Sequence, residues 1–206
     1  MSESAMPRKG RVRLRRWAAL GVPGVLATAA LVVATAQGAL AAQFTISGMP
    51  FTINADKLQA TGMTQYGGLD NMHPDSPLHG DTGGQVAVFI TTMKNAEITN
   101  LCQAVAIGGT HLTITAGNKG TPAKATNLAT DSDTLTGRTG TFNGLEMGRD
   151  ASTLDKGFST GPLGTFGMQA DRIVVEDVYQ HNWATTAGAM TLPNLKIAFS
   201  EAGCGN

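Results

Sequence analysis

Short stretches of alternating apolar and polar residues, separated by glycine, asparagine, aspartate and proline, run from Gln43 to the C-terminus. Their apolar positions are Phe44/Ile46, Phe51/Ile53, Val86/Val88/Ile90, Leu112/Ile114 and Leu195/Ile197/Phe199. Successive side chains of a strand point to opposite faces, so this spacing predicts strands with one buried face. Threonine fits a pleated surface better than a helix, and no convincing 3.6-residue period follows Gln43. The sequence therefore predicts a mostly β fold, a single domain of short strands.

An internal similarity leaves the architecture of this domain open. Residues 55–65 align without gaps to residues 170–180 with Ala, Asp and Gln identical, and residues 96–103 form a looser copy. The dipeptide Asn-Leu recurs at Asn127-Leu128 and Asn194-Leu195. Stacked repeats would form an irregular β-solenoid. Related strands with one buried face each would instead form a β-sandwich or an open barrel.

The beginning of the chain has a different character. Six basic residues lie between Arg8 and Arg16, the run from Trp17 to Ala36 is uncharged and largely apolar, and Ala39-Leu40-Ala41-Ala42 follows. This layout is typical of a secretory signal, although about 20 apolar residues can also span a bilayer as a helix. We expect residues 1–42 to be one N-terminal hydrophobic helix, either a cleaved signal peptide or a single-span membrane anchor. Residues 43–206 would then be an exported domain, secreted or anchored outside the cytoplasm.

Charge and cysteine content agree with export. Six of the 15 basic and one of the 15 acidic residues lie in residues 1–42, which leaves 9 basic and 14 acidic residues in the rest. An acidic domain has no electrostatic footprint for nucleic acid, so we expect no nucleic-acid partner. The two cysteines, Cys102 and Cys204, both lie in the exported part. Outside the cytoplasm such a pair most often forms a disulfide, although two free thiols or a cysteine nucleophile are the alternatives.

One short motif points to catalysis. Residues 157–161 match G-x-S-x-G, with Ser159 in the place of an esterase nucleophile, and Asp177 and His181 follow as candidate acid and base. That motif works where a buried strand precedes the serine and a helix follows it. Here polar residues precede Ser159 and Pro162 follows at once. The sequence therefore favours a noncatalytic protein, with this triad as a weak candidate.

The segment 67–84 is rich in turn-forming residues and predicts a long loop, as does the segment 148–167. The first of these carries four candidate metal ligands, His73, Asp75, His79 and Asp81. Imidazole and carboxylate groups suit a divalent ion, but ligands so close in one loop lack a scaffold that fixes their geometry. We expect neither a metal nor any other cofactor.

Four segments carry a resemblance to a known family: residues 41–68, 96–103, 148–154 and 183–188. They resemble a family of exported, uncharacterised actinobacterial proteins that genome pipelines often label "cholesterol esterase". The resemblance extends over most of the chain, including the basic leader and both cysteines. It implies an envelope or secreted location, and it supplies no catalytic residues.

Together these features predict an exported cell-envelope protein with a noncatalytic binding or structural role. Its partners would be the membrane, through an uncleaved N-terminal segment, and an envelope lipid, glycan or protein. An esterase acting on lipid esters is one alternative, based on Ser159 and the family label. A lipid- or glycan-binding module with an open apolar face is the other.

Overall fold

A computed structural model of the chain describes residues 45–204. The expected N-terminal helix and the other features of residues 1–42 lie outside these residues. Within residues 45–204, no helix is long and apolar enough to cross a membrane. The strands are β1 (Phe51–Asn71), β2 (Gln85–Thr99), β3 (Leu101–Ile107), β4 (Thr110–Ala116), β5 (Ala123–Thr136), β6 (Thr139–Asn143), β7 (Glu146–Asp150), β8 (Phe166–Thr186), β9 (Ala189–Thr191) and β10 (Lys196–Ser200). Two short helical turns, α2 (His79–Thr82) and the 3-10 turn η1 (Ala151–Thr153), complete the described elements.

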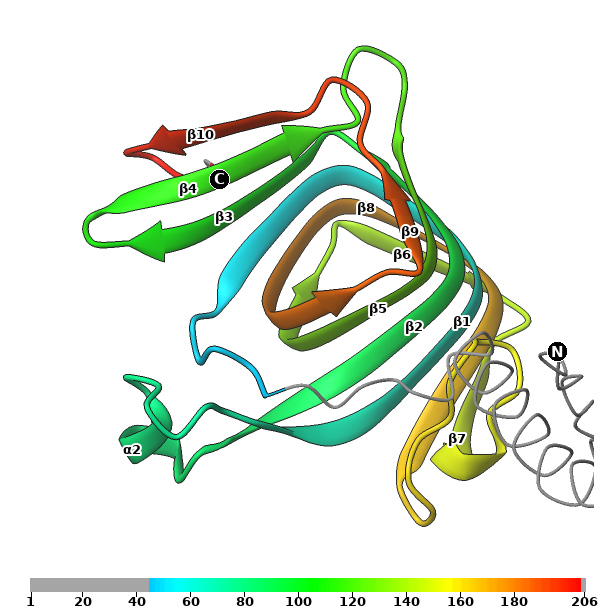
Figure 1. Cartoon of the computed structure of the whole chain (residues 1–206). Helices are drawn as coiled ribbons and strands as arrows, with labels where there is room; N and C mark the ends of the chain where they lie inside the picture. The colour runs from blue at the N-terminus through cyan, green and yellow to red at the C-terminus, as the bar shows by residue number, and fades with distance from the viewer. Residues whose placement is uncertain (1–44, 205–206) are drawn as a thin grey trace, which may run out of the picture. The chain divides into compact units, whose positions relative to one another are not determined.

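All ten strands belong to one antiparallel sheet that curls around itself (Figure 1). Its order is β10-β4-β3-β1-β2-β5-β8-β6, with β8 also paired to β1, β7 paired to β8 and β9 paired to β5. The mostly β prediction is confirmed. The strands are longer than expected, since β1 and β8 each span 21 residues. A single antiparallel sheet is neither two packed sheets nor a stack of parallel coils, and it does not form a clear barrel.

The long strands bend together along a line that crosses four of them. One residue of each strand lies on this line: Asp171 of β8, Gly62 of β1, Lys94 of β2 and Asn127 of β5. Neighbouring residues on the line are opposite each other but do not pair, whereas the ladder on both sides of them is continuous. Gly62 and Asn127 have φ values of 63° and 47°. Glycine and asparagine adopt this left-handed conformation at the lowest cost, which explains their presence at the bend.

A second bend crosses the same sheet six residues earlier in β1. Asp56 of β1 lies opposite Asp177 of β8 and Asn100, which follows β2, and ladder pairing is again interrupted there. Asp177 and Asn100 have φ values of 53° and 52°. The amide of Asn100 donates a hydrogen bond to the carboxylate of Asp56, so the bend is fastened by side chains as well as by backbone geometry.

These bends shift the alternation of buried residues. On β1 the buried positions Leu58 and Ala60 are two apart, whereas the next core residue, Met63, comes three residues later, beyond Gly62. On β5 the buried Ala125 and Leu128 are likewise three apart, across Asn127. A strand can therefore keep one face on the core while the sheet turns, although its sequence loses a strict period of two.

The internal similarity maps onto these bends. Residues 55–62 and 170–177 lie antiparallel in β1 and β8, with the aspartate at the start of each segment opposite the positive-φ residue at the end of the other. In the recurring Asn-Leu pairs, Asn100, Asn127 and Asn194 all have positive φ. The repeated pattern thus marks bends within strands and turns between them, and it does not mark stacked repeats.

One main core fills the inner side of the sheet. Small side chains occupy much of it, because close approach of curled strands leaves little room for large ones. Its buried members are Ile53, Ala55, Leu58, Ala60, Met63, Met93, Ala96, Ile98, Leu101, Ala123, Ala125, Leu128, Ala170, Ile173, Val175 and Val178. Two smaller clusters, one around Met72 and one around Tyr66, lie beyond it.

Candidate functional site

Strands β3, β4 and β10 extend from the curled part of the sheet as an arm (Figure 1). Side chains directly opposite each other share a face. One face of the arm carries the row Gln103, Ile114, Ile197 and the row Val105, Leu112, Phe199. Phe199 is 69% exposed and Ile197 is 59% exposed. Large apolar side chains exposed in neighbouring rows make this face a candidate interaction surface. We refer to these two rows as the apolar face.

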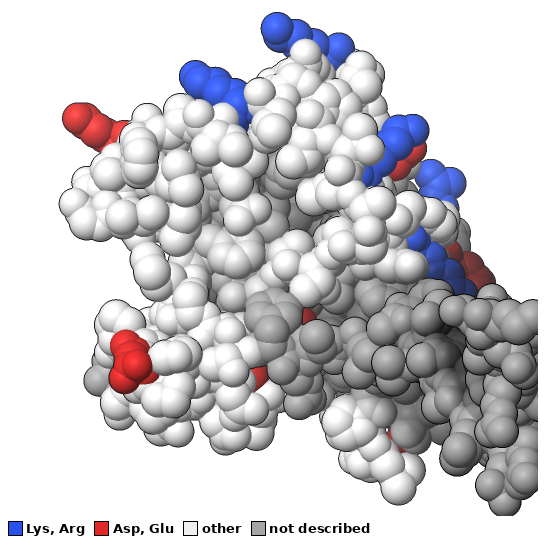
Figure 2. All heavy atoms as spheres, viewed as in Figure 1, with Lys and Arg blue, Asp and Glu red and all other residues white. Residues whose placement is uncertain are grey.

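The apolar face continues into the core of the curled part. Gln103 lies opposite Ile53 of β1, a buried core residue. Both residues line a cavity of about 50 Å³ whose walls also include Leu58, Met93 and Leu128. The half-exposed Met190 and the half-buried Thr185 border the same cavity. None of the residues that line it is charged. In Figure 2 the upper and lower parts of the molecule flank a hollow whose visible walls are almost free of charge.

Three threonines form one cross-strand row beside this cavity. Thr91 of β2 lies opposite Thr130 of β5, which lies opposite Thr185 of β8. Thr130 and Thr185 line the cavity, and Thr91 continues the row on the same face. The Oγ1 atoms of all three are buried and accept or donate no hydrogen bond within residues 45–204. Leaving a buried hydroxyl unpaired is costly, so three in a row point to a missing partner.

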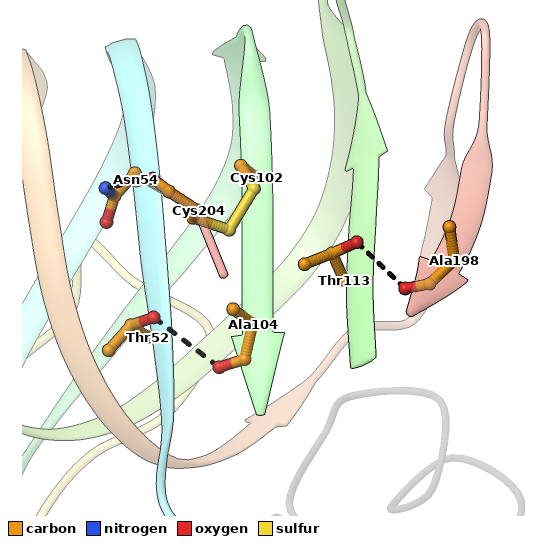
Figure 3. Close-up of a disulfide and its surroundings, with 7 residues drawn as sticks. All are labelled: Thr52, Asn54, Cys102, Ala104, Thr113, Ala198 and Cys204. Atoms are coloured by element: carbon orange, nitrogen blue, oxygen red, sulfur yellow. Dashed lines mark hydrogen bonds between the residues drawn. A yellow bond between two sulfur atoms is a disulfide. The ribbon is translucent and has the colours of Figure 1, made fainter. Parts of the chain in front are cut away.

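The opposite face of the arm carries the disulfide. Cys102 of β3 is bonded to Cys204, with their Cα atoms 5.7 Å apart (Figure 3). The Asn54 amide donates a hydrogen bond to the Cys204 carbonyl over 3.1 Å. The predicted disulfide is therefore present. It closes a separation of 102 residues and holds the C-terminal segment beside β1 and β3. An open groove of about 880 Å³ surrounds it, lined by residues that include Thr52, Asn54 and His111.

Ser159 lies on a loop that covers β1. Its Oγ is 3.2 Å from the Tyr66 hydroxyl, and its carbonyl accepts a hydrogen bond from Thr64 over 3.1 Å. The fully buried Gln169 holds this loop, because its side-chain oxygen accepts from the backbone N–H groups of Asp155 and Lys156. Burial raises the pKa of Tyr66, and the charge of Asp131 adds to this shift.

The other two candidate catalytic residues lie elsewhere. His181 of β8 lies opposite Thr52, twelve positions from Thr64 along β1, and its Nδ1 is 2.8 Å from an Asp133 oxygen. Asp177 accepts a hydrogen bond from the Arg138 guanidinium at the second bend. Each of the three residues thus has its main contacts with different neighbours, and the structure does not assemble them into a triad.

The candidate metal ligands do not form a group of three among the side chains that the structure describes. The His73 and Asp75 side chains are exposed, with Nδ1 and Oδ2 separated by 3.7 Å, and His79 belongs to α2. The side chain of Asp81 lies outside what the structure describes. Among the side chains that are described, no three His, Cys, Asp or Glu residues come close enough to hold a metal ion.

The proximity of two carboxyl groups, Asp70 and Asp131, is not predicted by the sequence. Burial raises the pKa of Asp131 to about 7, and the nearby charge of Asp70 adds to this shift. Burial also raises the pKa of Asp70. The two residues belong to β5 and β1, 61 positions apart, so no local pattern brings them together. The three threonines are missed as well, because they come from three different strands and Thr is abundant throughout this chain.

These features define an antiparallel β domain that has one exposed apolar face and a disulfide that holds its C-terminal segment. The chain belongs to the family of unknown function DUF6230, whose model matches residues 47–204. Comparisons with curated proteins and with solved structures find no match.

Proposed function

We propose that this protein is exported and binds an amphiphilic lipid of the cell envelope, without catalysing a reaction. The observation that supports this is the continuity between the apolar face and the uncharged cavity behind it, through Gln103 and Ile53. A ligand with a hydrocarbon chain can cover the face and place its polar end at the cavity. Each methylene group removed from water contributes about 0.8 kcal/mol, so a chain of ordinary length supplies enough energy for binding.

Location outside the cytoplasm rests on the leader and on the disulfide. The basic and apolar segments of residues 1–42 have the layout of an export signal or anchor. A disulfide that fastens the C-terminal segment persists in an oxidising compartment and is rare in the cytosol. Envelope lipids are the abundant apolar molecules in such a location.

The surroundings of Ser159 do not support the esterase alternative. An acyl-transfer serine needs a base within hydrogen-bonding distance of its hydroxyl. The Oγ of Ser159 contacts the hydroxyl of Tyr66, a phenol whose raised pKa keeps it protonated at neutral pH, so it is not available to accept the serine proton. The imidazole of His181 is held by Asp133. A binding role therefore explains more of the structure than an esterase does.

Binding of a dodecanoyl probe with a fluorescent head group to the full chain, as exported by its host, tests this proposal. We expect Phe199→Asp to weaken binding at least tenfold, because it removes a large apolar contact and introduces a charge. Ser200→Asp adds the same charge at the next residue, on the opposite face of β10, and should leave binding unchanged.

Two results would count against the proposal. One is failure of the unmodified protein to bind the probe. The other is a dimer in light scattering that Phe199→Asp, but not Ser200→Asp, converts to a monomer, since the apolar face would then be an interface between two copies.

A further inference from the structure

The three threonines beside the cavity have buried hydroxyls without a partner in residues 45–204, and assigning them a ligand rests on the proposed function. We propose that Thr91, Thr130 and Thr185 bind the polar head of a neutral amphiphile through oxygen atoms of its hydroxyl or ester groups. The apolar face would bind its hydrocarbon chain.

The three hydroxyls are shielded from solvent and lie at one end of the cavity. Thr91 is 5% exposed and Thr130 is 3% exposed, so neither hydroxyl is available to bulk solvent. Two residues along the same faces of β2 and β5 lie Met93 and Leu128, which line the cavity. The hydroxyls therefore form the polar end of an apolar space. Strand spacing places neighbouring hydroxyls about 5 Å apart, a distance that suits separate oxygen atoms on one small head group.

A fourth group extends the site by one row. Asn182 of β8 is fully buried and lies opposite Ser132 of β5, whose hydroxyl donates to the Asn182 side-chain oxygen over 2.5 Å. The Nδ2 of Asn182 is buried and has no partner within residues 45–204. An amide nitrogen donates only, whereas threonine hydroxyls both donate and accept. The combination fits acceptor oxygens that are accompanied by at least one hydroxyl.

Charge selects the class of head group. No charged side chain lines the cavity, so a carboxylate or phosphate placed there would lose its hydration without gaining a counter-charge. Volume sets its size, because about 50 Å³ has room for about three or four waters and hence for a compact head. A monoacylglycerol has both properties, since its glycerol ester is small, uncharged and rich in oxygen.

Three twelve-carbon probes distinguish the head group from the chain: monododecanoylglycerol, dodecanoate and dodecane. Calorimetric titration of the exported protein should give the tightest binding for monododecanoylglycerol. We expect Thr130→Val to weaken that binding about fivefold, and Thr130→Val combined with Thr185→Val to weaken it by more than tenfold. Dodecane binding should not change. The matched control is Thr126→Val, an exposed threonine of the same strand.

The outcomes separate this inference from the function on which it rests. If none of the three probes binds, the proposed function is wrong and the inference falls with it. If the probes bind without preference for the neutral oxygen-bearing head, or if the preference survives both valine substitutions, the apolar face binds lipid while the threonines hold only water. Tighter binding of dodecanoate would likewise overturn the neutral head group. Valine has the shape of threonine and removes an unpaired hydroxyl, so unchanged or raised melting temperatures exclude misfolding as the cause.

Discussion

The curled part of the sheet, formed by β1, β2, β5 and β8, and the arm, formed by β3, β4 and β10, are built from the same kind of strand and differ in what covers them. Both are antiparallel, and both alternate apolar with polar residues. Leu128 in the curled part is 2% exposed, whereas Phe199 in the arm is 69% exposed. Alternation therefore specifies an apolar face, and it does not specify whether another part of the same chain covers that face.

The bends account for the difference. The four curled strands carry the two bend lines, with positive φ at Gly62, Asn127 and Asp177 among other positions. Inside β3, β4 and β10, none of the residues has positive φ. The arm therefore runs straight on from the curl, and its apolar face has no opposite wall within residues 45–204. We infer that the chain keeps this surface free for a ligand.

The largest expected difference between the two regions is the loss of stability when one large apolar side chain in each is replaced by alanine. We expect Leu128→Ala to lower the free energy of unfolding by about 2–5 kcal/mol, because it leaves a cavity in the core. Phe199→Ala should change it by less than about 0.5 kcal/mol, since the side chain contacts mainly solvent. Urea denaturation monitored by circular dichroism measures both. Similar losses for the two variants would mean that the arm is covered in solution, contrary to the structure.

A smaller effect is expected at the bends. Asn127→Val places a β-branched residue at a φ of 47°, which should cost about 1–2 kcal/mol. Asn127→Gly accepts the same conformation and should be close to neutral. Thr126→Val, at the preceding exposed position with ordinary strand geometry, serves as the control. If Asn127→Val is as stable as the unmodified protein in the same denaturation experiment, positive φ at this position does not set the bend.

How far the sequence alone leads differs between these features. Periodicity and threonine content predict the β class, and the pair Cys102 and Cys204 predicts the disulfide. The period of two also predicts strands at residues 86–90, 112–114 and 195–199, all of which fall in or overlap β2, β4 and β10. The length of β1 and β8 is missed, because each bend resembles a break between two short strands. Residues 67–71, expected in a loop, continue β1.

The candidate site is much less accessible to such reasoning. Its threonines are 39 and 55 positions apart along the chain, and they meet only because β5 lies between β2 and β8. Ser159, by contrast, attracts attention through a five-residue pattern, yet its neighbours in space are Thr64 and Tyr66. Local motifs are visible without a structure, whereas the rows that build a site across a sheet depend on strand order and register.

The smallest effect concerns pH and separates two carboxyl groups of β5. Burial raises the pKa of Asp131 to about 7, well above the value of 3.8 expected in the unfolded chain. Between pH 3.8 and about pH 7 the folded protein therefore holds a proton on Asp131 that the unfolded chain has released. The contribution of this group to stability is complete below about pH 4 and is lost as the pH rises through 7. Asp133 behaves in the opposite way. Burial opposes its ionisation, but hydrogen bonds with Trp183 and His181 outweigh burial and lower its pKa, so its contribution is lost as the pH falls.

Both carboxyl groups are partly open to solvent, and we therefore expect changes of only about 1 kcal/mol. Chemical denaturation between pH 4 and pH 8 should show that Asp131→Asn removes a decline in stability on the alkaline side, while Asp133→Asn leaves that decline in place. Asp70→Asn should also reduce the decline, because the negative charge of Asp70 is part of what raises the pKa of Asp131. If Asp131→Asn does not change the stability profile between pH 4 and pH 8, the Asp131 carboxyl group is ionised in the folded protein throughout this range. Asp131 would then be well hydrated, and the curled part of the sheet would be less closed to solvent around it than its buried core indicates.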